Sequence, residues 1–198
     1  MLDGKKVLAL IPARGGSVRI PDKNLRSIGA NSLVASAILV ARSCKLIDTI
    51  VVSSDSDEIL AEARKFPEVT LIKRPDYLAT SEATMAVVVE HTNYIVQGHE
   101  IFVLLEPSTP LRAGKDLENV LRATKMNSQS PAVTVTKYND QRTIVNINDD
   151  GSAQRNSSRT LSRNSSRNLS GWAGLAGLAV PAERHCLSCL GGVDWVVL

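Results

Sequence analysis

Cysteine, aromatic residues and long apolar runs are all scarce in this sequence. Its three cysteines, Cys44, Cys186 and Cys189, are too few and too unevenly spaced for a disulfide framework. No apolar run approaches the roughly 20 residues that a membrane-spanning helix needs. No small-residue cleavage site follows the short apolar run near the amino terminus. We therefore expect neither a secreted nor a membrane protein, and a cytoplasmic location.

Acidic residues are rare in the last part of the chain, 151–198, where arginine and serine are common. The segment RNSSRTLS at 155–162 is repeated almost unchanged as RNSSRNLS at 163–170. Such repeats cannot bury a core. We therefore divide the chain into a domain at 1–150 and an atypical, loosely attached or disordered tail at 151–198.

Neither nucleic acid nor zinc is an expected ligand of this tail. Its basic repeats have no interleaved aromatic residues on which bases could stack. The group His185-Cys186-Leu187-Ser188-Cys189 lacks a fourth zinc ligand, since Cys44 is far away in sequence. A binding segment for other acidic partners is the remaining alternative to a solvated tail.

Strand-like and helix-like segments alternate before this tail. With 198 residues, of which 43% are hydrophobic, the chain can bury the core of one globular domain. The apolar patterns predict strands at 7–11, 49–53, 69–72, 101–105, 132–136 and 143–147, and helices at 32–44, 55–65, 81–96 and 115–126. The expected caps of the first three helices are Ser32 or Asn31, Asp55 with Glu58, and Ser81 with Glu82. The alternation predicts an α/β fold, a mostly parallel sheet with helices on both faces.

The most informative stretch is a loop directly after the first strand, bounded by Pro12 and Pro21. Gly15 and Gly16 have no Cβ, so their backbone N–H groups can approach an anion. Four cationic side chains accompany them: Arg14, Arg19, Lys23 and Arg26. The loop therefore favours polyphosphate binding, with a solvated basic turn as the alternative.

Polar residues also follow the next three strands. They are Ser53 to Asp55, Arg74, and Glu106 with Ser108. In open parallel sheets the ligand lies outside the carboxyl ends of the strands, so four loops should meet at one edge. For Asp55 alone, the helix cap remains our first interpretation.

These segments resemble the CMP-sialic acid synthetases (acylneuraminate cytidylyltransferases). ARGGSVRIPDKNL at 13–25 is similar to that family's Ala-Arg-Gly-Gly-Ser-Lys-x-Ile-Pro-x-Lys-Asn-Leu. Further matches are VVSSD at 51–55, Arg-Pro-x-x-Leu-Ala at 74–79 and LLEPSTPLR at 104–112. The matches occur in the family's order over roughly residues 1–150, and they imply a Rossmann-like nucleotidyltransferase. The Pro-Ser-Thr-Pro-Leu-Arg loop resembles the sialate branch more than synthetases for the eight-carbon acid KDO.

The resemblance implies a reaction and a set of site residues. The expected substrates are CTP and N-acetylneuraminate or a related nonulosonic acid, with Mg²⁺ as cofactor and a homodimer as the assembly. The implied nucleotide-binding residues are Ala13, Arg14, Gly15, Gly16, Ser17, Lys23, Asn24, Arg74 and Thr84. Of these, Arg14 and Lys23 are the implied catalytic residues. The implied sugar-binding residues are Glu106, Ser108 and Thr109, and Glu106 is also the candidate metal ligand.

Three departures from the family leave alternatives open. Val18 replaces the usual lysine, although Arg19 beside it could supply the charge, and Glu106 replaces the usual glutamine. The Glu106 carboxylate could bind Mg²⁺ or repel an acidic sugar. The family's Asn-Gly-Ala-Ile-Tyr strand, dimerisation segment and late Asp-x-Asp metal pair are not found after residue 150. The tail is thus a replaced or frame-shifted terminus or a divergent one, and the alternative function is a nucleotide-binding but catalytically incompetent homologue.

Overall fold

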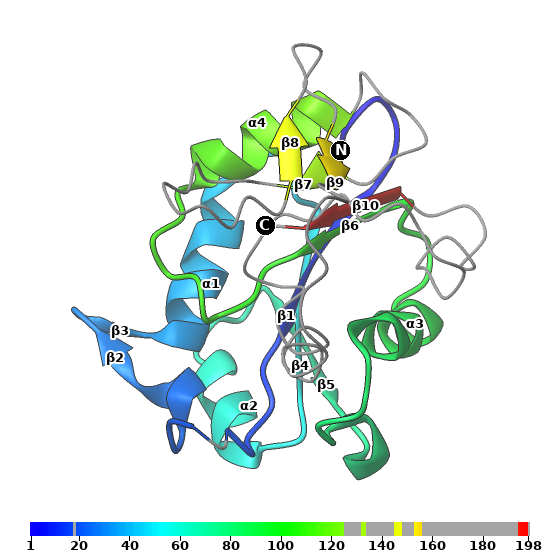
Figure 1. Ribbon diagram of the computed structural model, residues 1–198. Coiled ribbons are helices and arrows are strands. Elements are labelled where there is room, and N and C mark those ends of the chain that lie inside the picture. The colour runs from blue at the N-terminus through cyan, green and yellow to red at the C-terminus, as the bar shows by residue number, and fades with distance from the viewer. Residues whose placement is uncertain (18, 125–131, 134–144, 148–152, 156–193, 198) are drawn as a thin grey trace.

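A parallel sheet forms the centre of the protein in the computed structural model (Figure 1), which describes residues 1–17, 19–124, 132–133, 145–147, 153–155 and 194–197. Within these residues the main sheet has the strand order β5-β4-β1-β6-β10-β7, and every neighbouring pair is parallel. The strands are β1 (Val7–Pro12), β4 (Thr49–Ser54), β5 (Val69–Lys73), β6 (Ile101–Leu104), β7 (Ala132–Val133) and β10 (Asp194–Val197).

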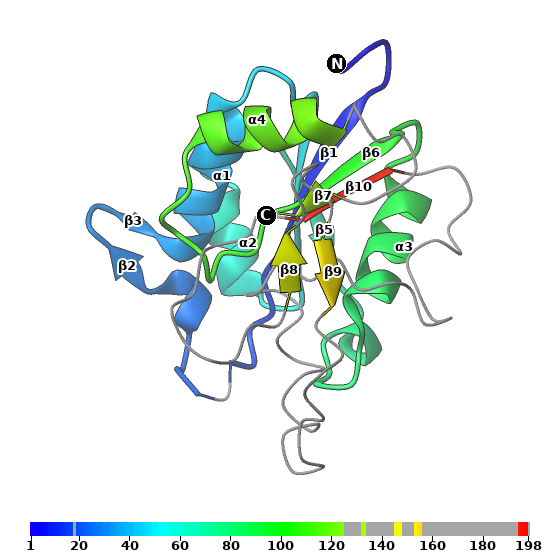
Figure 2. The same ribbon diagram turned by 45° about the horizontal axis from the view of Figure 1, so that its top comes forward.

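Helices cover both faces of this sheet (Figures 1 and 2): α1 (Leu33–Ser43), α2 (Asp57–Ala63) and α4 (Gly114–Thr124) lie on one face, and α3 (Met85–Ile95) lies on the other. The alternating side chains of β1 explain the two layers, since successive residues of a strand point to opposite faces. Val7, Ala9 and Ile11 pack in the core under α1, α2 and α4. Leu8 and Leu10 pack in a second core that includes Val89 of α3. The predicted α/β fold with helices on both faces is confirmed.

Strand β1 is buried along its whole length because β4 and β6 flank its edges and the helices cover both of its faces. Leu10 is in register with Val51 on one side and with Leu104 on the other. The first four predicted strands are confirmed to within a residue or two at their ends. Among the described residues, no helix combines the length and the apolar character needed to cross a membrane.

The helix starts confirm one predicted cap and overturn two. Ser32 caps α1, because its side chain accepts a hydrogen bond from the Ala35 N–H. The prediction that Asp55 caps the second helix is wrong: α2 begins two residues later, and the Ser56 side chain is its cap. The third helix begins at Met85 with Thr84 at the cap position, so Ser81 and Glu82 precede it by a turn.

Three short elements complete the described chain before α4. A two-stranded antiparallel hairpin, β2 (Ser27–Ile28) with β3 (Asn31–Ser32), was not predicted. It lies between α1 and the loop bounded by Pro12 and Pro21, which we call the glycine loop. Single 3₁₀ turns occur at Lys23–Leu25 and Asp76–Leu78.

The carboxyl-terminal part is described only in pieces. Strand β8 (Val145–Ile147) lies within the predicted strand at 143–147 and pairs antiparallel with β9 (Ala153–Arg155), which was not predicted. Strand β10 lies between β6 and β7 in the main sheet. The arginine-serine repeats, apart from Arg155, and the His185 to Cys189 group lie outside the described residues. The division at residue 150 stays a prediction.

Candidate nucleotide-binding site

The loops after β1, β4, β5 and β6 leave the sheet at the same edge. Hydrogen bonds between neighbouring strands continue into these loops: Ala13 N–H donates to the Ser53 carbonyl (3.0 Å) and Arg74 N–H to the Ser54 carbonyl (2.7 Å). On the other side, Leu105 N–H donates to the Leu10 carbonyl (2.8 Å). The structure therefore brings together the four polar segments that the sequence places after successive strands.

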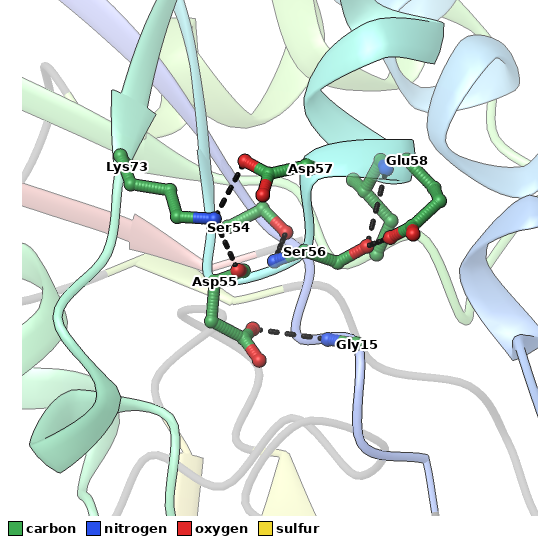
Figure 3. Close-up of polar contacts among 8 residues, drawn as sticks. Gly15, Ser54, Asp55, Ser56, Asp57, Glu58 and Lys73 are labelled. Atoms are coloured by element: carbon green, nitrogen blue, oxygen red, sulfur yellow. Dashed lines mark hydrogen bonds and ion pairs between the residues drawn. The ribbon is translucent and has the colours of Figure 1, made fainter.

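The glycine loop is held by two side chains from outside it. Asn24 is buried, and its Nδ2 donates to the Arg14 carbonyl at 2.9 Å. The Asp55 carboxylate accepts a hydrogen bond from Gly15 N–H, with 3.0 Å between N and Oδ1 (Figure 3). Within the loop, Ser17 N–H donates to the Gly15 carbonyl at 2.8 Å. Asp55 is therefore a partner of the loop and not a helix cap.

Gly15 also makes a close approach that a side chain would force apart. A Cβ built on Gly15 would lie 2.9 Å from the Ser56 Cβ and 3.5 Å from Asp55 Oδ2. Real carbon–carbon contacts are optimal at about 3.5–4.0 Å. A Cβ built on Gly16, by contrast, would meet no atom within 4 Å. The two glycines thus have different reasons to be present.

Two cationic residues expected at the triphosphate flank this loop. Arg14 is half-buried, and its Nη1 lies 3.4 Å from the Thr80 carbonyl, which brings the segment after β5 against the glycine loop. Lys23 is half-buried and close enough to Glu106 for its charge to act on that carboxyl group. Within the described residues, the Lys23 ammonium makes no hydrogen bond or ion pair. The charge of Lys23 therefore has no partner in the described chain and lies near Glu106, which follows β6 at this edge.

Arg74, expected to contact the nucleotide, is buried in this structure and hydrogen-bonded to Ser53. Its Nε donates to Ser53 Oγ (3.1 Å) and its Nη2 to the Ser53 carbonyl (2.7 Å), with only 4% of the residue exposed. Burial lowers the pKa of the guanidinium, Asp55 opposes this shift and Arg14 adds to it. Thr84 is exposed at the start of α3, and no hydrogen bond joins it to the glycine loop in the described part of the chain. Nucleotide contacts of both residues stay predictions.

The loop after β6 folds around Glu106. The Glu106 carbonyl accepts hydrogen bonds from Thr109 N–H (3.3 Å), Thr109 Oγ1 (3.1 Å) and Arg112 Nη2. The Glu106 carboxylate accepts one from Ser108 Oγ at 3.3 Å. Glu106, Ser108 and Thr109, the predicted sugar-binding residues, are thus gathered in one tight turn.

Electrostatics at this turn are set mainly by burial. Burial raises the pKa of the Glu106 carboxyl group, and the Ser108 hydrogen bond and the charges of Lys23 and Arg112 partly offset the rise. Burial also lowers the pKa of Arg112 to about 10, against the opposing charge of Glu106. Sequence reasoning did not assign Arg112 to the site. The available signal was its position as the last residue of LLEPSTPLR.

The described residues contain no group of three or more His, Cys, Asp or Glu side chains that could hold a metal ion. At this edge Glu106 has two cations near it, and the Asp55 carboxylate is bonded to Gly15 N–H. Carboxylate oxygen is a suitable ligand for Mg²⁺, but one such ligand needs further oxygens to complete the coordination. The role of Glu106 as a metal ligand therefore stays a prediction.

Known proteins similar to this chain were found by sequence and by structure. The sequence model of a family described as cytidylyltransferase matches residues 8–171. The chain is 30% identical over 149 residues to the N-acylneuraminate cytidylyltransferase of Escherichia coli O18:K1:H7, an alignment that covers 73% of this chain and 35% of the relative. It is 30% identical over 129 residues to the CMP-N,N'-diacetyllegionaminic acid synthase of Legionella pneumophila, covering 63% of this chain and 56% of the relative.

Among solved structures, a CMP:2-keto-3-deoxy-manno-octonic acid synthetase complexed with CTP is similar with a TM-score of 0.56. The match has 19% sequence identity and covers 66% of this chain and 52% of the other, so it supports the fold alone. The chain spans between about a third and somewhat over half of the length of these two curated relatives.

Proposed function

Since the chain belongs to the cytidylyltransferase family, we propose that it joins CTP to a nonulosonic acid to give a CMP-sugar and pyrophosphate. The family match over residues 8–171 is the observation that carries this proposal. The names of the two relatives support it further, because both are cytidylyl-transferring enzymes of acidic sugars. N-acylneuraminate and N,N'-diacetyllegionaminic acid are accordingly the first two candidate classes of sugar.

The proposed reaction is an in-line displacement at the α-phosphorus. The anomeric hydroxyl oxygen of the sugar forms a bond to the α-phosphorus of CTP and loses its proton. The bond from that phosphorus to the oxygen bridging the β-phosphorus breaks, and pyrophosphate leaves. Most of the catalysis in such a step comes from positioning and from neutralising charge on the phosphates.

The residues at the sheet edge are suited to positioning the triphosphate and neutralising its charge. Arg14 and Lys23 are the cations beside the glycine loop and would neutralise the triphosphate. Ala13, Gly16 and Ser17 would line it, and Asn24, which fixes the Arg14 carbonyl, would hold the loop in shape. Mg²⁺, which this family generally uses, would supply further positive charge at the phosphates when bound.

The Glu106 turn is the proposed sugar side of the site. Ser108 and Thr109 have hydroxyl groups suited to hydrogen bonds with a sugar, and the partly buried Arg112 donates to the carbonyl of Glu106 in the same turn. An acidic sugar would be attracted by Arg112 and Lys23 and opposed by ionised Glu106. The raised pKa of Glu106 reduces this opposition as the pH falls.

Pyrophosphate release tests the function directly. The purified chain is incubated with CTP and Mg²⁺, with N-acetylneuraminate, with N,N'-diacetyllegionaminic acid or with no sugar. Sugar-dependent release well above the no-sugar control supports the proposal and identifies the sugar. Calorimetric CTP binding without release from either sugar supports a nucleotide-binding, catalytically incompetent homologue instead. The family resemblance also extends the proposal to a homodimer, which light scattering of the same sample tests.

A further inference from the structure

We infer that Asp55 is a positioning residue that fixes the glycine loop for the triphosphate and leaves Gly16 N–H as a free amide donor between Gly15 and Ser17. The inference rests on the proposed function for its ligand, a nucleoside triphosphate. It goes beyond that function by assigning a role to a carboxylate on the β4–α2 turn, 40 residues from the loop that it holds.

The β4–α2 turn is held in place without the Asp55 side chain. Lys73 Nζ donates to the Asp55 carbonyl at 2.8 Å and to Asp57 Oδ1 at 2.6 Å. Ser56 N–H donates to Ser54 Oγ at 3.1 Å, and Ser56 Oγ caps α2 at Ile59 N–H. Figure 3 shows the Asp55 carboxylate directed toward Gly15, on the side of the turn away from Lys73. The side chain is therefore available to act on the glycine loop.

Hydrogen bonds engage two of the three amides in the Gly15, Gly16 and Ser17 segment of the loop. Gly15 N–H is taken by Asp55 and Ser17 N–H by the Gly15 carbonyl. Gly16 is exposed, and its N–H has no hydrogen-bond partner among the residues that the structure describes. Because the two bonds fix the peptides on both sides of Gly16, they set the direction of the Gly16 N–H. A preset donor loses less entropy when the anion binds.

The negative charge of a carboxylate beside a phosphate site repels the phosphate. The charge of Asp55 and its hydrogen bond to the loop therefore have opposite effects on anion binding. If Asp55 acted only through its charge, removing it would strengthen binding of an anion. If it acts as a hydrogen-bond acceptor, Asp55→Ala should weaken binding, whereas Asp55→Asn keeps an acceptor oxygen and loses the repulsion. The two variants therefore separate the hydrogen bond from the charge.

The test measures the dissociation constant of CTP for the full chain by calorimetry. We expect Asp55→Ala to raise it by about tenfold, as for loss of a hydrogen bond to a charged group. Asp55→Asn should bind CTP as tightly as the parent or more tightly. Asp57→Asn is the matched control: it removes the same charge from an exposed side chain two residues along and keeps an oxygen that accepts from Lys73, so it should bind CTP like the parent. Binding by Asp55→Asn as weak as that of Asp55→Ala, or undiminished binding by Asp55→Ala, overturns the inference.

A second readout needs no nucleotide and separates this inference from the proposed function. Hydrogen exchange of Gly15 N–H, followed by NMR without ligand, should be at least about tenfold faster in Asp55→Ala. It should stay slow in Asp55→Asn and Asp57→Asn. If CTP does not bind to the parent chain, the proposed function is wrong, and this exchange still tests the hold of Asp55 on the loop. Equal Gly15 exchange in the parent and Asp55→Ala contradicts that hold.

Discussion

Exchanging each glycine of the loop for alanine tests whether the close approach to Ser56 matters. Gly15→Ala would place a Cβ 2.9 Å from the Ser56 Cβ, whereas Gly16→Ala would place one with no atom within 4 Å. Neither glycine has its backbone in the left-handed region, so both backbones accept alanine. The pair differs in steric surroundings and is otherwise matched.

The size of the effect follows from the geometry. To reach an ordinary carbon–carbon contact of about 3.5 Å, Gly15→Ala must move the loop and Ser56 apart by about 0.6 Å. A shift of that size in the loop would lengthen the 3.0 Å bond between Gly15 N and Asp55 Oδ1 to about 3.6 Å, too long for a hydrogen bond. Overpacking of this kind costs about 1–3 kcal/mol. Gly16→Ala should instead be neutral or stabilising by up to about 1 kcal/mol, because alanine restricts the unfolded chain.

Thermal unfolding followed by circular dichroism measures the difference. For a chain of this size 1 kcal/mol shifts the midpoint by about 2–4 °C. We expect a midpoint roughly 2–12 °C lower for Gly15→Ala and a midpoint at or slightly above the parent's for Gly16→Ala. Equal midpoints for the two variants, or a greater loss for Gly16→Ala, would refute the packing of Gly15 on Ser56.

Three further predictions concern a charge, a titration and a cap. Lys23→Ala should lower sugar-dependent pyrophosphate release by about 10²–10³-fold with an unchanged unfolding midpoint, because a phosphate-facing cation is lost. The exposed control Lys65→Ala should retain full activity, and unchanged kinetics of Lys23→Ala would remove Lys23 from the site. Because burial raises the pKa of Glu106, the stability associated with this group is present below its usual value near 4.5 and is lost as the pH rises through the raised pKa. The free energy of unfolding of Glu106→Gln, relative to that of the parent, should therefore increase as the pH rises from 4 to 8, as measured by urea unfolding. A difference that stays constant with pH would contradict the raised pKa. Ser32→Ala should lose about 1 kcal/mol of unfolding free energy with the α1 cap, whereas Ser36→Ala within α1 should not, and equal effects would argue against the cap.

Helix starts show where local sequence rules succeed and where they mislead. Ser32 precedes an apolar helical pattern and caps it, because a cap needs only its own side chain and an N–H three residues later. Asp55 with Glu58 has the same local form, yet Ser56 is the cap. The Asp55 carboxylate instead bonds Gly15, a partner that no local pattern reveals.

Arg74 and Glu106 show the same division at the site. The sequence correctly places both residues at the ends of strands, where a ligand of a parallel sheet would lie. It does not reveal that Arg74 is 4% exposed and bonded to Ser53, or that burial raises the pKa of Glu106. Burial depends on what packs over a residue, and these neighbours come from segments far apart in the chain.

Apolar periodicity and short motifs lie within a few neighbouring residues, so they predict the alternation of strands and helices, the two-sided α/β sheet and the family. Which side chains meet depends on the tertiary structure. The register that pairs Pro12 with Ser53 sets the glycine loop beside the β4–α2 turn, and thereby joins Gly15 to Asp55. The strand order of the sheet likewise puts β10 next to β6, although the two strands are far apart in the sequence. Such pairings depend on strand order and register across the whole sheet, which no single stretch of sequence contains.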